Sequence, residues 1–514
     1  MASIDAPRTI LCASVVVAAT LYGLWSRKNS HKLPLPPGPR QLPLVGNLFD
    51  VPAAFQWETY ARWSKEYNSD IIHLNMMGKS VIVLCSLEAT DALLEKHSSM
   101  YSDRADLPMV VDLMGWGFNI ALMKYGDGWR THRRLFNQAF NVRASQYYRP
   151  QQLAVTHALL ERLLHSPDAF LDHFRQLAGE LIMSAAYGIS VLPSNDPYVD
   201  LARKAIRPFS LANVPGLYLV DTFPILKHVP RWFPGAGFKR KAEEWKKLSR
   251  AMVEVPFAET KRQMECATTP VSFTSESLNA LNNRDGLYYE EDHVKSTAGT
   301  MFIGGADTSA SGLGYFVLAM LANPEAQKKA QEEIDRVTGG KYLPTFEDEE
   351  ALPYVAALLK EVLRWKMVTP FAIPRLLGTD DEYRGYRLPA GSLVIGNAWA
   401  VLHDEAVYPN PHEFKPERFL LDGKLDPAVK DPISAFGYGR RLCPGRHLAT
   451  ATLWIGIVSM LATFDIRKAV NDQGDIIEPT YEYISGFISG PVPFKCSITP
   501  RSTAAVDLIQ AARN

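Results

Sequence analysis

Apolar residues spaced three or four positions apart predict helices along most of this chain. The longest pattern covers residues 293–322, where Asn323-Pro324 ends it, and a further helix is expected to about residue 337. Helical patterns dominate the stretch from residue 127 to about 370. The other helices are expected over residues 57–67, 351–365 and about 445–464.

Short strands are predicted in two places. Residues 71–74 and 81–84 flank a Met77-Gly78 turn, which indicates a hairpin. Residues 372–396 contain short strand patterns, with turns at Arg384-Gly385 and Ala390-Gly391, and the proline-rich stretch 408–419 is expected to be irregular. The fold class is therefore mainly α with a small β part.

The N-terminal region predicts a membrane anchor. Residues 9–25 form a 17-residue run without charge, near the lower limit for spanning a bilayer. Basic residues follow the run and no Ala-x-Ala site does, which favours an anchor with a cytosolic domain over a cleaved signal peptide. Whether the run spans or only dips into the membrane stays open. The predicted order is a luminal N-terminus (1–8), a single transmembrane anchor (9–25), a basic and proline-rich linker (26–40) and one globular domain (41–514).

Composition narrows the function classes. The 55 basic and 55 acidic residues balance, which argues against charge-driven binding of nucleic acid. A hydrophobic content of 47% and a charged content of 21% exclude a disordered chain and a polytopic membrane protein. The five cysteines are sparse and form no C-x-x-C pair, so neither a disulfide framework nor a structural zinc site is expected.

The segment 436–445, Phe-Gly-Tyr-Gly-Arg-Arg-Leu-Cys-Pro-Gly, carries the strongest chemical signal. As a thiolate, Cys443 can be the axial ligand of a haem iron. Gly439 and Gly445 would let the backbone fold close to the sulfur, so that N–H groups can donate to it. A helix that begins just after the cysteine would direct its positive end toward the anion.

This segment matches the pattern F-x-x-G-x-R-x-C-x-G and resembles the haem-binding loop of the cytochrome P450 family. The resemblance covers nearly the whole chain. In overall sequence character, the chain is similar to fungal microsomal members of the family that act on secondary metabolites. It implies a cytochrome P450 fold in which residues 41–514 form a haem-thiolate catalytic domain. Cys443 is then the proximal iron ligand, Phe436 covers the proximal face of the haem and Arg441 meets a haem propionate.

Three more residues are implied to hold haem propionates. Trp129 and Arg133 are four positions apart and share one face of a predicted helix. Arg375 follows Pro374 in a predicted strand. By resemblance to the family, all three contact propionates of haem b.

A structural triad is implied by Glu361-Val362-Leu363-Arg364, which matches E-x-x-R, together with Arg418 of a later Pro-Glu-Arg-Phe segment. The spacing alone indicates only an i,i+3 ion pair. Two other matches occur, Glu259–Arg262 and Glu333–Arg336. Position in the chain separates them, because only Glu361 lies on a helix 82 residues before the cysteine, with the segment 416–419 between them.

The middle of the longest helix reads Gly304-Gly305-Ala306-Asp307-Thr308-Ser309, which includes poor helix formers. Close packing against another backbone would account for this. The alternative, favoured by resemblance, is a local widening over a haem. Thr308 would then steer protons to bound oxygen and Asp307 would relay them from solvent.

The resulting prediction is a membrane-anchored haem-thiolate monooxygenase. It would insert one oxygen atom from O2 into a C–H or C=C bond of a hydrophobic molecule, such as a terpenoid or a polycyclic aromatic compound. Electrons would come from NADPH–cytochrome P450 reductase, with cytochrome b5 as an additional candidate, at the endoplasmic reticulum membrane. Substrate-pocket candidates by family position are Met109, Leu113, Phe302, Ala306, Phe371, Ile373 and Phe487.

Two other functions remain open at this point. One is a haem-thiolate isomerase or dehydratase that needs no O2, against which the Asp307-Thr308 pair argues. The other is a non-enzymatic haem protein.

Overall fold

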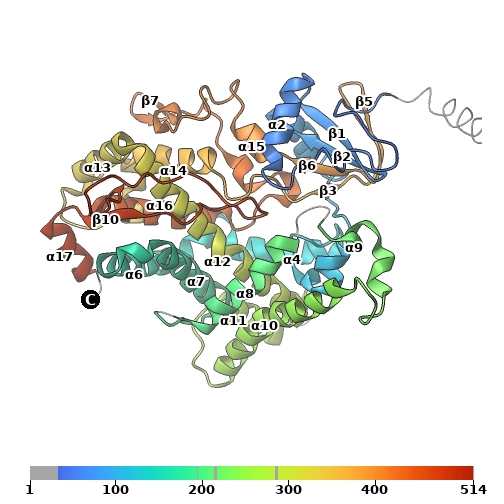
Figure 1. The fold of residues 1–514 in the computed structure, drawn as a ribbon. Helices are drawn as coiled ribbons and strands as arrows, with labels where there is room; N and C mark the ends of the chain where they lie inside the picture. Colours follow the sequence, from blue (N-terminus) through green and yellow to red (C-terminus); the bar gives the residue numbers. More distant parts are fainter. Residues whose placement is uncertain (1–32, 194, 213–216, 284–287, 513–514) are drawn as a thin grey trace, which may run out of the picture.

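The computed structural model describes residues 33–512, except residues 194, 213–216 and 284–287. Helices form most of the protein, and the strands of the main sheet lie together at the upper right of Figure 1, whereas β7 (Leu420–Leu421) and β10 (Cys496–Pro500) lie on the opposite side. The longer helices are α2 (Gln56–Glu66), α4 (Asp127–Phe140), α6 (Arg149–His165), α7 (Phe170–Tyr187), α8 (Pro197–Ala212), α10 (Gly237–Glu265), α11 (Phe273–Asn283), α12 (Glu291–Ala322), α13 (Pro324–Thr338), α14 (Pro353–Trp365), α16 (Arg446–Thr463) and α17 (Thr503–Ala511). The short ones are α3 (Leu87–Thr90), α5 (Val142–Ser145), α9 (Leu219–Thr222) and α15 (Ala398–Leu402).

The main sheet has four strands in the order β1-β2-β6-β3. Its strands are β1 (Ile71–Met76), β2 (Lys79–Leu84), β3 (Arg375–Leu376) and β6 (Leu393–Gly396). β1 and β2 form the predicted hairpin, with Ile71 opposite Leu84, and the turn uses positive φ at Met77 and Gly78. β2 pairs in parallel with β6, which joins the N-terminal hairpin to the chain that follows α14.

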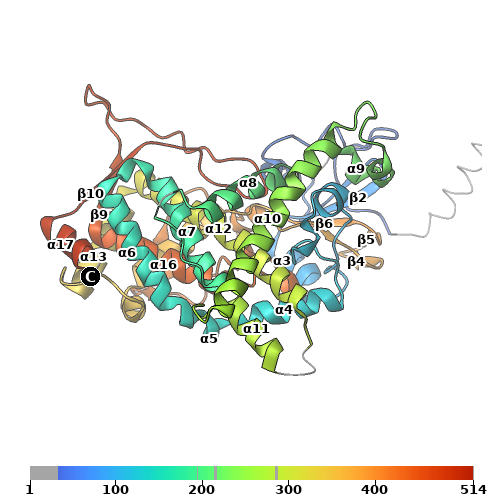
Figure 2. The same ribbon diagram turned by 90° about the horizontal axis from the view of Figure 1, so that it is seen from below.

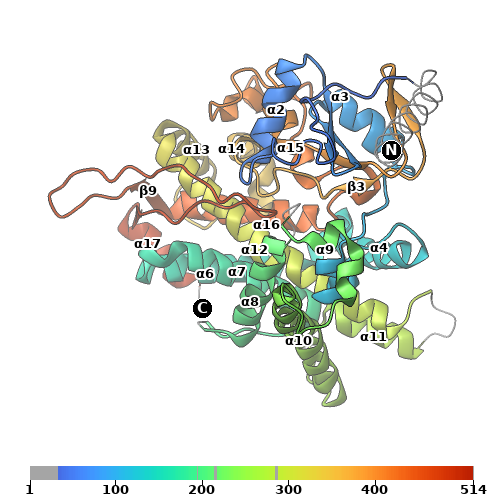
Figure 3. The same cartoon turned by 45° about the vertical axis from the view of Figure 1, so that its right-hand side comes forward.

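Three two-stranded sheets complete the β part. They are β4 (Asp381–Tyr383) with β5 (Tyr386–Leu388), β7 (Leu420–Leu421) with β8 (Lys424–Leu425), and β9 (Phe464–Lys468) with β10 (Cys496–Pro500). The long connection between β9 and β10 extends from the helical body (Figure 3).

Helix α12 is the central element of the fold, and α7 packs along it (Figure 2). The largest core cluster joins α12 to α6, α7, α13, α14 and α16. A β-carbon added at Gly305 would lie only 2.7 Å from the Ile182 side chain of α7, so this glycine allows the two helices to approach closely. Helix packing thus fixes the position of the residues around 305.

The mainly α class and the small β part are confirmed. The helix predicted at 293–322 is α12, those predicted at 351–365 and 445–464 are α14 and α16, and the strands in 372–396 are β3 to β6. The prolines before residue 41 contact the sheet region: the carbonyl of Pro37 accepts a hydrogen bond from the His73 N–H, 2.9 Å away.

The anchor predicted over residues 9–25 lies outside the described residues and stays a prediction. Among residues 33–512 that the structure describes, no helix combines the length and apolar character needed to span a bilayer.

Candidate active site

Cys443 lies in a tight loop just before α16. Its N–H donates to the carbonyl of Phe436 at 2.9 Å, which closes the loop. Burial raises the pKa of the Cys443 thiol, while the backbone N–H of Gly445 and the charges of Arg133 and Arg446 lower it. The Gly445 N–H is therefore one donor toward the sulfur, and the role of Cys443 as an iron ligand stays a prediction.

The two glycines of the motif have different roles. Gly439 has a φ of +49°, and an added β-carbon would collide with the carbonyl oxygen of Leu94. Any larger residue would therefore force the loop away from the helical segment that contains Leu94. An added β-carbon at Gly445 would meet nothing within 4 Å, so this glycine acts through its N–H group instead.

A cavity of about 340 Å³ lies between the cysteine loop and α12. Cys443, Phe436 and Gly445 line one side of it, and Gly304 and Thr308 of α12 line another. The cysteine and the threonine predicted to act on one cofactor therefore face a shared space. Most of the other lining residues are apolar.

Arginines gather at one end of this cavity. Arg441 donates from Nε to the carbonyl of Ser102 at 2.8 Å and from Nη2 to that of Met123 at 2.7 Å. Arg375 donates from Nη2 to the carbonyl of Tyr438 at 2.5 Å. Arg104, which sequence reasoning missed, donates to the backbone from the same region.

In the described part of the chain these guanidinium groups make no salt bridge, although the charge of Asp103 acts on Arg104 and Arg441 and that of Glu95 on Arg375. Burial lowers the pKa of Arg104, Arg375 and Arg441, and the charge of Arg375 lowers it further for the other two, to about 9 for Arg441. Among the described lining residues there is no aspartate or glutamate. The buried Nε of Arg375 has no hydrogen-bond partner in the described part of the chain. A group with two carboxylates and a metal that binds a thiolate fits this arrangement, as haem does.

Trp129 and Arg133 occupy the predicted face of α4. The guanidinium of Arg441 lies 4.7 Å from the centre of the Trp129 ring, a cation–π contact. Arg133 donates from Nη1 to the carbonyl of Leu442 at 2.6 Å, which ties α4 to the cysteine loop. Both side chains line the cavity, beside the arginine cluster.

Asp307 and Thr308 follow each other on α12 but have different surroundings. Thr308 lines the cavity, and its hydroxyl donates to the carbonyl of Gly304 at 2.6 Å. Asp307 does not line the cavity. Its carboxylate lies 3.8 Å from Nε of Arg175 on α7. Burial raises the pKa of Asp307, and Arg175 opposes that shift.

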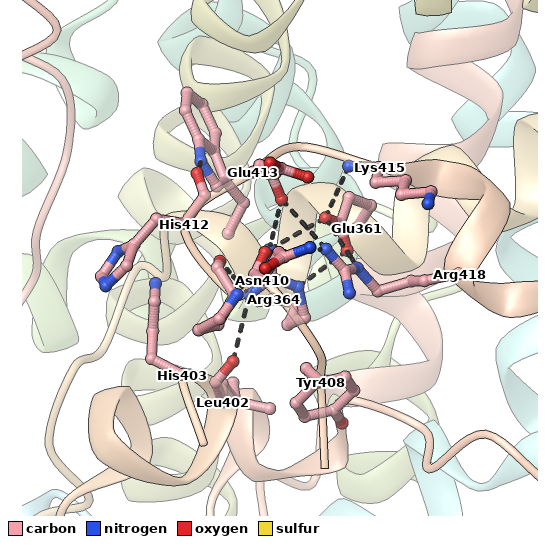
Figure 4. Close-up of polar contacts among 12 residues, drawn as sticks. Glu361, Arg364, Leu402, His403, Tyr408, Asn410, His412, Glu413, Lys415 and Arg418 are labelled. Carbon is pink, nitrogen blue, oxygen red and sulfur yellow. Dashed lines mark hydrogen bonds and ion pairs between the residues drawn. The ribbon is translucent and has the colours of Figure 1, made fainter. Parts of the chain in front are cut away.

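Glu361, Arg364 and Arg418 form the predicted triad (Figure 4). Arg364 donates two hydrogen bonds to the Glu361 carboxylate, at 2.7 and 2.8 Å, and Arg418 adds a third at 3.1 Å. Arg364 also donates to backbone carbonyls, including that of Pro411 at 2.7 Å. The triad therefore joins α14 to the irregular chain after α15 and does not touch the cavity.

The other two E-x-x-R pairs are of a different kind. Glu259 and Arg262 pair on the exposed side of α10. Glu333 accepts hydrogen bonds from the N–H groups of Tyr354 and Val355 at the start of α14, and lies 3.8 Å from Arg336. Burial of both charges distinguishes the Glu361–Arg364 pair from these two.

The substrate-pocket candidates divide into two groups. Phe371, Ile373 and Phe487 line the cavity. Four others do not line it and pack into the surrounding core: Met109, Leu113, Phe302 and Ala306. Phe302 and Ala306 are four residues apart, so they share a face of α12 that turns toward the core, where the Phe302 ring packs against Tyr187.

Lining residues that the sequence analysis did not find come from several elements. They include Arg104, Asn119, Ile182 and Phe209. No local pattern marks them, because Arg104 stands between acidic residues and Ile182 and Phe209 belong to ordinary apolar helix patterns.

Comparison with known proteins gives a consistent result. The cytochrome P450 family model matches residues 36–498. The chain is 46% identical to cytochrome P450 monooxygenase 98 of Postia placenta, over 95% of this chain and 94% of that protein. It is 44% identical to cytochrome P450 monooxygenase ple1 of Rhodocybe pseudopiperita (94% of this chain, 92% of that protein). It is 40% identical to tryptamine 4-monooxygenase of Psilocybe cyanescens (96% of this chain, 98% of that protein).

Proposed function

The chain belongs to the cytochrome P450 family and is a monooxygenase, and we propose that it oxidises a hydrophobic secondary metabolite. The proposed reaction inserts one oxygen atom from O2 into a C–H or C=C bond. The observation that carries this proposal is the cavity shared by Cys443 and Thr308, because it places a thiolate ligand opposite a proton-donating hydroxyl.

The cofactor of the family is a haem with a thiolate ligand, and we assign haem b to this chain. When bound, the haem supplies the redox chemistry that activates O2. Cys443 would hold its iron, and Phe436 would cover the face next to the thiolate. Arg133, Arg375 and Arg441 would bind its carboxylates, with Trp129 beside Arg441. We add Arg104 to this set because it lines the cavity and belongs to the same buried cluster of arginines.

Asp307 and Thr308 of α12 form an acid–hydroxyl pair that would transfer protons. The Thr308 hydroxyl stands at the cavity wall, where its Oγ1 can pass a proton to a bound reactant. Asp307 lies on the side of α12 toward Arg175, outside the cavity lining, and can take up protons there. The raised pKa of the Asp307 carboxyl keeps its protonated form accessible nearer to neutral pH.

The substrate class follows from the cavity walls. Phe209, Phe371, Ile373 and Phe487 present aromatic and aliphatic groups, which favour an apolar molecule such as a terpenoid or a polycyclic aromatic compound. One relative is named tryptamine 4-monooxygenase, and the indole ring of tryptamine supports only the aromatic part of this proposal.

The proposed partners are NADPH–cytochrome P450 reductase, with cytochrome b5 as an additional donor, and membrane lipid. The uncharged run 9–25 and the basic residues that follow it support a single-pass anchor in the endoplasmic reticulum, with the catalytic domain in the cytosol.

Oxygen-isotope labelling tests the function. The full-length protein would be incubated with reductase, NADPH, ¹⁸O2 and a panel of terpenoids and polycyclic aromatic compounds. We expect one ¹⁸O atom per oxidation, with product that depends on NADPH. Product formed without NADPH and without ¹⁸O would favour the isomerase alternative, and haem-loaded protein without turnover of any compound would favour a non-enzymatic role.

A further inference from the structure

A second cavity, of about 350 Å³, borders the segment 366–373, which also lines the active-site cavity between the cysteine loop and α12. Pro370 lines only the second cavity, residues 371–373 line only the active-site cavity, and Lys366 and Met367 line both. The second cavity is therefore a separate space beside the active site. Its volume is in the range of small-molecule binding sites.

Aromatic and imidazole rings form most of the wall of the second cavity. Of its ten described lining residues, six carry such a ring. The Trp399 and His403 rings of α15 stack with 4.3 Å between their centres and 14° between their planes. The His412 ring lies 5.3 Å from that of His403 (Figure 4), and Trp365 and Tyr483 supply further rings. Walls of this kind favour a planar aromatic ligand, which can stack on them or meet them edge to face.

Lys366 places a cation among these rings. Its Nζ lies 5.0 Å from the centre of the Trp365 ring and 4.5 Å from that of the Tyr483 ring, and it donates to the carbonyl of Tyr481 at 3.1 Å. Both rings line the second cavity and neither lines the active-site cavity, so the ammonium group belongs to the second cavity.

The charge of Lys366 is only partly compensated. Burial lowers the pKa of the ammonium group, and Lys366 makes no salt bridge with any residue that the structure describes. An ammonium group has three N–H donors, of which Tyr481 accepts one, so two remain for a ligand. An anionic oxygen would satisfy these donors and the charge together.

Two further polar groups narrow the ligand class. Glu58, an exposed residue that also lines the second cavity, accepts a hydrogen bond from the Tyr483 hydroxyl and favours the protonated form of Lys366. Its carboxylate would repel a second negative charge on the ligand, which limits the ligand to a monoanion. The buried His403 ring donates from Nδ1 to the carbonyl of Trp399 at 2.9 Å, which leaves Nε2 as an acceptor. Burial lowers the pKa of His403 to about 3, so this ring is neutral at neutral pH.

We infer that the second cavity is a binding site for a planar aromatic monocarboxylate. The carboxylate binds Nζ of Lys366, and the ring packs on the Trp399–His403 stack, where Nε2 of His403 can accept a ring N–H. This ligand differs from the substrate, because neither Cys443 nor Thr308 lines the second cavity. The inference goes beyond the proposed function, since binding here requires neither haem nor turnover.

A matched pair of probes tests the inference: indole-3-acetate and its neutral analogue indole-3-acetamide. The dissociation constants of both are measured by calorimetry with the full-length protein in detergent. We expect one equivalent of the carboxylate to bind about 3- to 30-fold more tightly than the amide, as for a charge-assisted compared with a neutral hydrogen bond. Lys366→Met should remove this preference. Trp399→Leu should weaken the binding of both probes about 10-fold and leave the preference in place.

Two controls distinguish the second cavity from the active-site cavity. Phe487→Leu makes the corresponding change from an aromatic residue to leucine in the active-site cavity, and it should leave both affinities unchanged. Saturating 4-phenylimidazole, which binds a haem iron and so fills the active-site cavity, should not displace either probe. Each variant is first checked by thermal unfolding, so that lost binding is not mistaken for lost structure.

The inference is overturned if neither probe binds saturably up to about 1 mM. It is also overturned if Lys366→Met retains the preference for the carboxylate or if Trp399→Leu leaves both affinities unchanged. Loss of binding in Phe487→Leu or displacement by the azole would place the probes in the active-site cavity and overturn it as well. Failure of the proposed function is a separate result, seen as a missing carbon-monoxide band in protein that still binds indole-3-acetate.

Discussion

Glu361 and Arg364 form a two-pronged ion pair from which solvent is fully excluded (Figure 4). Nε and Nη2 of the arginine lie 2.7 and 2.8 Å from the two carboxylate oxygens. The carboxylate also accepts the N–H of Lys415 at 2.8 Å. The pair therefore connects α14 to the chain that leads to the cysteine loop.

Breaking this pair should prevent stable folding. Glu361→Gln leaves the Arg364 charge buried without its counter-ion, at a cost of about 3–5 kcal/mol. We expect low haem content and a strongly lowered melting temperature. The matched control is Glu259→Gln, which breaks a pair of the same residue types and spacing on the protein surface. If both variants melt at the same temperature, the buried pair does not have the role assigned to it.

The two adjacent glycines of α12 should respond differently to alanine. At Gly305 the new methyl group meets Ile182 at 2.7 Å, which should cost about 1–3 kcal/mol of stability. At Gly304 it meets nothing within 4 Å and faces the cavity, so stability should be unchanged or about 0.5–1 kcal/mol higher. Thermal unfolding of the two variants measures the difference. Equal loss in both would contradict the packing of α7 on α12.

Arg175 should control the pH dependence of turnover through Asp307. Burial raises the pKa of Asp307 and the charge of Arg175 lowers it, so Arg175→Met should raise that pKa further. If the protonated carboxyl supplies the proton, product formation falls as the pH rises through its pKa. The falling limb of the pH–rate profile should therefore move to higher pH in the variant.

Asp172→Asn is the control for that experiment. It removes the other carboxylate bound to Arg175, at 2.8 Å, but leaves the arginine beside Asp307. The falling limb of the pH–rate profile should then not move to higher pH. A profile that is identical for the parent protein and Arg175→Met would show that Asp307 is not the group that titrates.

Arg104 should contribute to haem retention. Its guanidinium belongs to the buried cluster with Arg375 and Arg441, whose charges a dianionic cofactor would balance. Arg104→Met should lower the ratio of haem to protein after gel filtration, while Arg130→Met on the exposed side of α4 should not. Full haem content in Arg104→Met would remove this arginine from the binding set.

Sequence patterns predicted the elements of this fold because local spacing determines them. The β1–β2 hairpin and the ends of α12 follow from turn residues and helix stops, which act within a few residues. Phe302 and Ala306 show the limit of this reasoning. Helix α12 is apolar on most of its surface, so only its packing against α7 shows which face meets the cavity.

The site residues also divide into those that the local sequence predicts and those that only the tertiary fold identifies. The cysteine motif is contiguous, so its chemistry could be predicted directly from the sequence. The role of Glu361 could not be derived from spacing, because Glu259–Arg262 has the same spacing on the surface. Arg104 lies between Asp103 and Asp106, which resembles an exposed polar stretch, and only the tertiary fold buries it.

The central claim is that Cys443 is the thiolate ligand of a haem. The most direct measurement is the absorption spectrum of the dithionite-reduced, carbon-monoxide-bound protein, beside Cys443→Ala. We predict a strongly red-shifted Soret band in the parent protein and its absence in the variant. A band at the position of histidine ligation, or folded protein that binds no haem, would contradict the account.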